Sequence, residues 1–145
     1  MMRAPETICQ IDRFPAQGAQ KATQTGFIST HLLVEMWQSP FNLLADAKVV
    51  EKALRYGVSG DYHDEHGEVI SYQFSPYGVS AKATLGDSHI FIHTWPENGY
   101  AAIDIFAGSD EEAYEIFERL KEAFKPHYIH ALEMKRGQLV EMEET

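Results

Sequence analysis

The sequence contains little cysteine and no long apolar run. Cys9 is the only cysteine in the 145 residues, so no disulfide can form within the chain, which fits a reducing compartment. No apolar segment approaches the roughly 20 residues that a membrane-spanning helix requires. Residues 1–26 also lack the apolar core of a secretory signal. We therefore expect a cytoplasmic protein that does not associate with a membrane.

Basic residues are also scarce. The chain has 12 Lys and Arg against 22 Asp and Glu, which gives a formal net charge of −10. Binding to nucleic acid or to an anionic membrane needs a basic face, so we expect neither partner. The acidity is compatible with a small cationic substrate. With 44% apolar residues, a chain of this length suits a single domain with one core.

The hydrophobic pattern predicts a fold that mixes strands and helices. The expected strands are residues 27–37, 69–74, 79–85, 89–95, 100–107 and 127–134. One helical stripe runs from Leu43 and is expected to stop at Gly57. A second helix begins at Ser109, where a capping box with Glu112 is possible, and ends at Pro126. The helices separate groups of strands, which predicts an α+β fold whose antiparallel sheet has both helices on one face.

The ends of the chain show no clear periodicity. We expect residues 1–26 to be a loose extension, residues 27–137 to be the domain and residues 138–145 to be a frayed tail. The polar segment 61–67 contains histidine and acidic residues, but no distant further metal ligand is evident in the sequence. We interpret it as a turn between two strands and expect no metal.

The segment at residues 86–98 reads Gly-Asp-Ser-His-Ile-Phe-Ile-His-Thr-Trp-Pro-Glu-Asn. Strand alternation places Ile90 and Ile92 on one face, and places His89, His93 and an aromatic pair on the other. A plain strand rarely carries two histidines and a tryptophan on one face. We do not expect a shared zinc, because four residues of strand separate the two histidines by about 13 Å.

This segment closely resembles the processing segment of the prokaryotic S-adenosylmethionine decarboxylases, which reads Glu-Ser-His-x-x-Ile-His-Thr-Trp-Pro-Glu. Further matching motifs lie at residues 31–35, 74–80, 99–106 and 135–137. Because several motifs occur in the order of the family, the chain is identified as a member. The resemblance implies a two-layer α/β sandwich whose sheets pair in a homodimer.

The resemblance also implies a self-made cofactor. In the family, the serine attacks the carbonyl of the preceding residue, the chain breaks, and the serine becomes an N-terminal pyruvoyl group that forms a Schiff base with the substrate. Ser88 matches this serine, so the cut is expected between Asp87 and Ser88. His93 matches the histidine that assists processing, by removing the α-proton. Ser80 matches the serine that helps to activate the scissile carbonyl.

The positions that bind the nucleoside in the family are also matched. Phe74 and Trp95 correspond to the aromatic residues on either side of adenine, and Glu97 corresponds to the carboxylate that holds the ribose. Ile90 is counted with these substrate-binding positions. A sulfonium nucleoside offers a flat ring and a positive charge, which suits such a site. The alternative is that Phe74 and Trp95 are core aromatic residues; an acid two residues after Trp95 favours binding.

The chain departs from the family at two positions. Asp87 replaces a glutamate, which keeps the charge. The family follows its Tyr-Ala-Ala strand with Thr-Cys-Gly, whose cysteine protonates the decarboxylated carbon; Gly108 stands at that position here. Ser109 has the opposite strand parity, and Cys9 is far away in the sequence.

Three functions therefore remain open. The first is a lyase that decarboxylates S-adenosylmethionine and supplies aminopropyl groups for spermidine and other polyamines. The second is a pyruvoyl-dependent decarboxylase of another amino acid, such as arginine or ornithine. The third is a non-catalytic homologue that binds a nucleoside or a partner chain. The adenine and ribose positions favour the first function, whereas the glycine at position 108 favours the other two.

Overall fold

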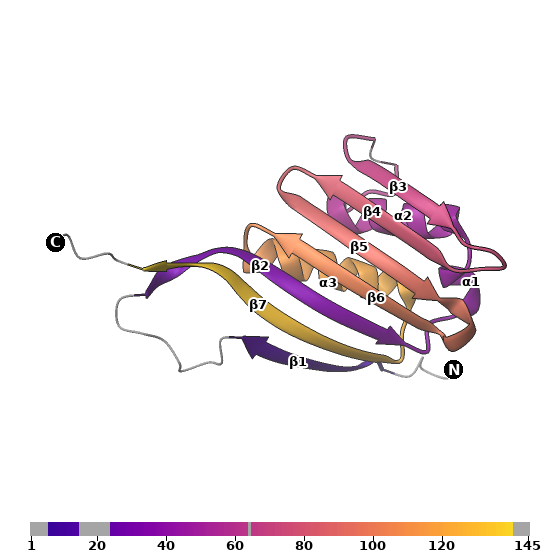
Figure 1. Cartoon of the computed structure of the whole chain (residues 1–145), viewed down its shortest axis with the longest axis horizontal. Coiled ribbons are helices and arrows are strands. Elements are labelled where there is room, and N and C mark those ends of the chain that lie inside the picture. The colour runs from indigo at the N-terminus through magenta and orange to yellow at the C-terminus, as the bar shows by residue number, and fades with distance from the viewer. Residues whose placement is uncertain (1–5, 15–23, 64, 141–145) are drawn as a thin grey trace.

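The structure, a computed structural model, describes residues 6–14, 24–63 and 65–140. The elements in chain order are β1 (Ile8–Phe14), β2 (Gln24–Trp37), α1 (Phe41–Leu44), α2 (Ala47–Ser59), β3 (Glu68–Gln73), β4 (Val79–Leu85), β5 (Ser88–Trp95), the short 3₁₀ helix η1 (Pro96–Asn98), β6 (Tyr100–Ala107), α3 (Asp110–Phe124) and β7 (Tyr128–Val140). The strands form one seven-stranded sheet in the order β1-β7-β2-β6-β5-β4-β3 (Figure 1).

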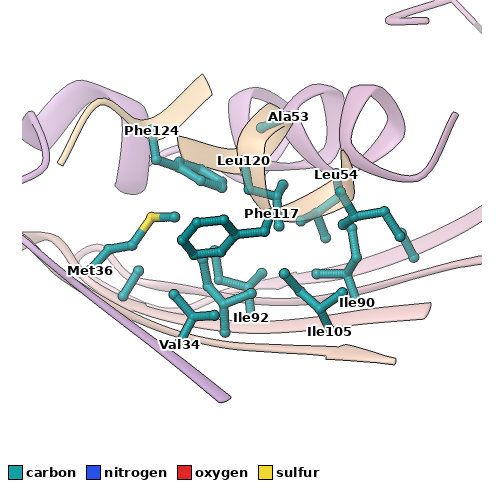
Figure 2. Close-up of a cluster of buried hydrophobic side chains, with 14 of the residues drawn as sticks. Val34, Met36, Ala53, Leu54, Ile90, Ile92, Ile105, Phe117, Leu120 and Phe124 are labelled. Atoms are coloured by element: carbon teal, nitrogen blue, oxygen red, sulfur yellow. The ribbon is translucent and has the colours of Figure 1, made fainter. Parts of the chain in front are cut away.

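Helices α2 and α3 cover one face of this sheet, which gives a molecule of two layers (Figure 1). Figure 2 shows the core between the layers, where apolar side chains of both helices lie over those of the central strands. The side chains labelled there are Val34, Met36, Ala53, Leu54, Ile90, Ile92, Ile105, Phe117, Leu120 and Phe124. The predicted α+β sandwich with helices on one face is confirmed. The parallel pairing of β1 with β7 departs from the expected wholly antiparallel sheet.

The helix ends follow from local chemistry, with one correction. The Ser109 side chain accepts a hydrogen bond from the Glu112 N–H, as predicted for the start of α3. Gly57, however, does not end α2, which continues to Ser59 and is capped by Gly60 at a φ of 78°. Gly57 is buried where α2 meets α3, and a Cβ there would lie 2.7 Å from Cδ2 of Leu120. The glycine therefore permits close helix packing instead of stopping the helix.

The prediction of a loose N-terminal extension is wrong for Ile8–Phe14, which form β1 beside β7. The side chains of this edge strand are mostly exposed, so burial imposes no alternation on its sequence. The backbone of β1 pairs with β7, but this pairing requires no particular side chains and therefore leaves no hydrophobic pattern in the sequence. Residues 1–5 and 15–23 of the predicted extension lie outside the described residues.

The domain boundaries at residues 27 and 137 are also displaced. Strand β2 already begins at Gln24 and β7 runs to Val140, and their ends extend together beyond the other strands (Figure 1). Residues 138–140 therefore belong to the sheet, whereas residues 141–145 of the predicted tail lie outside the described residues. The described part of the segment at 61–67 is a turn, as predicted, but it joins α2 to β3 and not two strands. No helix among the described residues is long and apolar enough to cross a membrane.

Candidate active site

The Asp87–Ser88 peptide lies at a tight hairpin turn between β4 and β5. Leu85 pairs with Ser88, and Gly86 takes a φ of 62°, a left-handed conformation that favours glycine. Gly86 and Asp87 are exposed, whereas Ser88 is fully buried. The turn therefore places the predicted scissile peptide at the surface while the serine side chain points into the molecule.

The buried hydroxyl of Ser88 meets a carboxylate. Ser88 Oγ donates a hydrogen bond to Oε1 of Glu112 at the start of α3. The N-terminus of a helix favours a negative charge, and Asp110 and Glu111 share this first turn. The sequence predicts instead that the Glu112 side chain returns to its own helix cap. The two residues are 24 positions apart, so only the packing of α3 against the start of β5 reveals the contact.

Ser80 and His93 are brought together on the opposite face of the sheet. They pair across β4 and β5, and Ser80 Oγ lies 2.7 Å from Nδ1 of His93. A hollow of about 370 Å³ around them is lined also by Lys82 and Phe91. His93 is five residues along β5 from Ser88, roughly 16 Å at about 3.3 Å per residue. The two residues predicted to assist processing, Ser80 and His93, therefore contact each other but do not contact Ser88 of the same chain.

Phe74 and Trp95 both lie at the surface, with 47% and 42% of their area exposed, which contradicts the alternative that they are core residues. The Phe74 N–H donates to the Gly78 carbonyl at 2.8 Å, which continues the β3–β4 ladder. The β4–β5 register, extended by two residues beyond the Ser80–His93 pair, places Gly78 beside Trp95. Gly78 has no side chain and lies between the two aromatic residues, whose strands are roughly 10 Å apart. A flat ring fits between side chains with this spacing.

The two remaining substrate-binding candidates differ in placement. Glu97 is exposed in η1, two residues beyond Trp95. Ile90 is fully buried on the helix-facing side, where its Cδ1 approaches Gly57. Its side chain faces away from Phe74 and Trp95 and lies on the same side as Ser88, so its place among the substrate-binding positions stays a prediction. The alternation of β5 already placed Ile90 on the face opposite Trp95.

Gly108 follows β6 directly and lies across from Asp87. The register His89↔Phe106, extended by two residues, places them side by side. A Cβ on Gly108 would lie only 2.5 Å from Oδ2 of Asp87. The Asp87 carboxylate thus occupies the space that a side chain at position 108 would need. Cys9 pairs with Ile129, far from this end of the sheet, and cannot replace the missing thiol.

His89 of β5, two residues beyond Asp87 and on the same face of the sheet, does not supply a ready acid. His89 stacks on Phe106 with ring centroids 4.5 Å apart, and Phe106 stacks on His31 at 3.8 Å. Burial lowers the pKa of His89, and electrostatic interactions with Lys82 and His31 lower it further. A histidine with a lowered pKa is neutral at pH 7. It is therefore a poor proton donor at neutral pH.

The fold and this site define a class of enzyme, the α/β-sandwich decarboxylases. The crystal structure of adenosylmethionine decarboxylase from Aquifex aeolicus matches with a TM-score of 0.72 and 25% identity, covering 83% of this chain and 99% of that one. A family model described as S-adenosylmethionine decarboxylase matches residues 30–137. The chain belongs to the S-adenosylmethionine decarboxylase family, whose members are carboxy-lyases.

Relatives with the name "S-adenosylmethionine decarboxylase proenzyme" agree with this assignment. The one from Moorella thermoacetica is 39% identical over 116 residues, which span 76% of this chain and 88% of the relative. The one from Thermotoga petrophila is 33% identical over 119 residues, which span 79% of this chain and 88% of the relative. The family predicted from the linked sequence motifs is thus confirmed.

Proposed function

We propose that the chain is a proenzyme that cuts itself between Asp87 and Ser88 and then decarboxylates S-adenosylmethionine. The observation that carries the proposal is the position of Ser88. Its buried hydroxyl donates a hydrogen bond to the Glu112 carboxylate, and the residue directly follows an exposed hairpin turn. This arrangement suits attack of the hydroxyl on the Asp87 carbonyl. A pyruvoyl group made from Ser88 supplies a ketone that stabilises the electrons left when carbon dioxide departs.

The substrate assignment rests on the opposite face of the sheet. Phe74 and Trp95 flank the side-chain-free Gly78, so a purine can stack between them. Glu97 lies just beyond Trp95, where a carboxylate can accept hydrogen bonds from ribose hydroxyls. The aromatic faces also favour the positive sulfonium of the substrate. Together these groups fit a cationic adenine nucleoside better than a simple amino acid.

We further propose that two copies pair through the uncovered sheet face. That face exposes several large apolar side chains, more than a monomer usually leaves in water. They include Trp37, Tyr72, Phe91, Trp95 and Tyr128. The Ser80–His93 pair lies too far from Ser88 of its own chain to assist it. In a homodimer the pair of one copy serves Ser88 of the other, whose hairpin turn is exposed.

A second candidate function is supported by Gly108. Without an acid at this position, decarboxylation of S-adenosylmethionine lacks the proton donor of the family, and the Asp87 carboxylate fills the vacant space. An enzyme for arginine or ornithine would need a different proton source. Under this candidate, Ser88 still forms the cofactor, but Phe74 and Trp95 have no substrate role.

Intact-protein mass spectrometry tests the cleavage, and a substrate panel tests the assignment. We expect two fragments, residues 1–87 and 88–145, with the second reacting with a carbonyl-trapping reagent. Ser88→Ala should remain one chain. Carbon dioxide release is then measured with S-adenosylmethionine, arginine, ornithine and lysine. A wild-type chain that stays whole after long incubation contradicts the proenzyme proposal, and durable turnover of arginine or ornithine alone contradicts the substrate.

A further inference from the structure

We propose that Glu112 is the general base that starts self-cleavage by accepting the proton of Ser88 Oγ. The inference rests on the proposed function, because it names the group that makes the Ser88 hydroxyl nucleophilic. Its basis is direct contact, since Ser88 Oγ donates to Oε1 of Glu112. An alcohol is a weak nucleophile at neutral pH and needs an adjacent base that can take its proton.

Helix α3 holds the Glu112 carboxylate in place. Glu112 is the third residue of α3, which is anchored in the core by Ile116 and Phe117. A negative charge at this end of a helix is stabilised by the unpaired N–H groups and the helix dipole. In an ordinary capping box the glutamate would return to the cap residue, Ser109. Here the Glu112 carboxylate instead accepts a hydrogen bond from the hydroxyl of Ser88, which belongs to strand β5 and does not cap a helix.

The histidines that follow Ser88 on β5 and the carboxylate of Asp87 lie on the opposite face of the sheet. Ser88 points toward the helices with Ile90, whereas the neighbouring histidines at positions 89 and 93 point away. The Asp87 carboxylate lies over Gly108 on that same opposite face. Glu112 therefore approaches the hydroxyl from the helix side, while the scissile carbonyl belongs to the exposed turn.

The proposed step moves one proton and transfers the Asp87 acyl group from nitrogen to oxygen. Glu112 takes the proton of Ser88 Oγ while Oγ forms a bond to the carbonyl carbon of Asp87. The C–N bond between Asp87 and Ser88 then breaks, and the leaving amine takes the proton back from Glu112. The product is an ester between Asp87 and the Ser88 side chain, with a free amine on Ser88 and a regenerated carboxylate. Loss of the α-proton of Ser88 then eliminates the 1–87 chain as a carboxylate and leaves dehydroalanine at position 88. Water hydrolyses the imine tautomer of this residue, which releases ammonia and leaves the pyruvoyl ketone.

The test measures the rate of cleavage of newly made full-length chain. The chain is synthesised in a cell-free system, synthesis is stopped, and conversion to fragments is followed by mass spectrometry from pH 5 to pH 9. Glu112→Gln keeps the size of the side chain and its hydrogen-bonding capacity but cannot take a proton. Glu111→Gln is the matched control, because Glu111 is an exposed neighbour in the same helical turn.

We expect Glu112→Gln to cleave roughly 10²–10⁴-fold more slowly, the usual contribution of a general base. The contribution of the carboxylate to the pH dependence of the wild-type rate should be lost in Glu112→Gln. Glu111→Gln should behave as the wild type. Circular dichroism of the accumulated Glu112→Gln chain should show a folded protein.

Three outcomes overturn the inference, and they separate it from the proposed function. If wild type and Glu112→Gln cleave at similar rates with the same pH dependence, Glu112 is not the base, although the proenzyme proposal stands. If the wild type never cleaves, the proposed function fails and this inference fails with it. A slow Glu112→Gln variant that keeps the wild-type pH dependence also overturns it, because the residue then only positions Ser88.

Discussion

Asp87 and Gly108 share one space on the uncovered face of the sheet, since a Cβ on Gly108 would lie 2.5 Å from Oδ2 of Asp87. The residue before the predicted cut and the position of the missing acid are therefore coupled. Any side chain introduced at position 108 has to displace the Asp87 carboxylate. Asp87 is exposed, so its side chain can rotate away at modest cost.

Gly108→Cys tests whether the missing thiol limits decarboxylation of S-adenosylmethionine. Without a donor the proton can reach the former pyruvoyl carbon, which converts the cofactor to alanine and ends activity. A thiol should raise turnover and increase the number of cycles before inactivation, because a general acid typically contributes 10²–10⁴-fold in rate. Steady-state and long-term release of carbon dioxide measure both effects.

Gly108→Ala is the matched control for this prediction. It introduces the same Cβ and displaces Asp87 equally, but it brings no acid. If the cysteine and alanine variants behave alike on S-adenosylmethionine, the thiol is not what the site lacks. An enzyme built for arginine or ornithine should gain nothing from either change.

A mixed dimer tests whether the Ser80–His93 pair of one copy serves Ser88 of the other. His93→Ala alone should stay uncleaved. When it is co-expressed with Ser88→Ala, the dimer contains one complete site, so His93→Ala chains should be cut. Chains with different affinity tags are purified together and weighed by mass spectrometry.

The control for the mixed dimer pairs His93→Ala with the double variant Ser88→Ala, His93→Ala, which offers no histidine. Cleavage in this control, or cleavage of His93→Ala by itself, would show that His93 is dispensable. Failure of the complementing pair to cleave would show that the site is not shared between copies.

The aromatic strip around Gly78 can be tested by substrate affinity. Trp95→Leu should raise KM for S-adenosylmethionine about 3–10-fold, as expected when one stacking contact worth 0.5–1.5 kcal/mol is lost. Self-cleavage should remain close to normal, because leucine keeps an apolar side chain on the proposed dimer face. Trp37→Leu is a matched control, because Trp37 is equally exposed but stacks on the far side of Tyr100. An equal rise in KM for both variants would contradict a specific adenine contact.

Tyr114→Phe should lower the free energy of unfolding by about 1–3 kcal/mol, because it removes a donor from a buried carboxylate. The Tyr114 hydroxyl donates to Glu133 at 2.6 Å, and Glu133 is only 5% exposed. Tyr56→Phe is the control, since its hydroxyl donates at 3.0 Å to the exposed Glu122 and should matter far less. Urea denaturation of the uncleaved Ser88→Ala chain measures both. Equal losses would contradict the role of burial.

The same tyrosine predicts a dependence of stability on pH. Burial and the Glu133 carboxylate raise the pKa of Tyr114 to about 12 from 10.0. Since the folded state holds the proton more tightly, this contribution to stability is complete below pH 10 and is lost as the pH rises toward 12. The Tyr114→Phe variant should not show this decrease in the free energy of unfolding between pH 10 and pH 12. Parallel curves for both proteins between pH 9 and pH 12 would contradict the assignment.

Much of the site was predictable because it lies on strands whose two faces differ in polarity. Ile90 and Ile92 alternate with His93 and Trp95, so the face of each side chain follows from parity. The contact between Ser88 and Glu112 was not predictable, because it depends on how α3 packs against β5. The separation of Ser88 from the Ser80–His93 pair follows from strand geometry. Only the observed contact between His93 and Ser80 indicates that these two residues act together at a Ser88 other than their own.

Strand β1 and Gly57 show two other limits of the sequence. An edge strand that exposes nearly every side chain needs no hydrophobic alternation, so Ile8–Phe14 resembled a loop. A glycine inside a helix resembles a stop unless the neighbouring helix is known. At Gly57 that neighbour is Leu120, which leaves no room for a larger residue.

Ser88 faces the helices whereas His93 faces away from them. Because the two residues of one chain cannot meet, the proposed maturation should follow second-order kinetics. A chain that needs a second copy to complete its cut matures at a rate that depends on the square of its concentration at high dilution. A solitary chain would then remain an inert precursor however well it folds. The reactive ketone would form only in chains that have dimerised, so dimerisation would control the appearance of the cofactor.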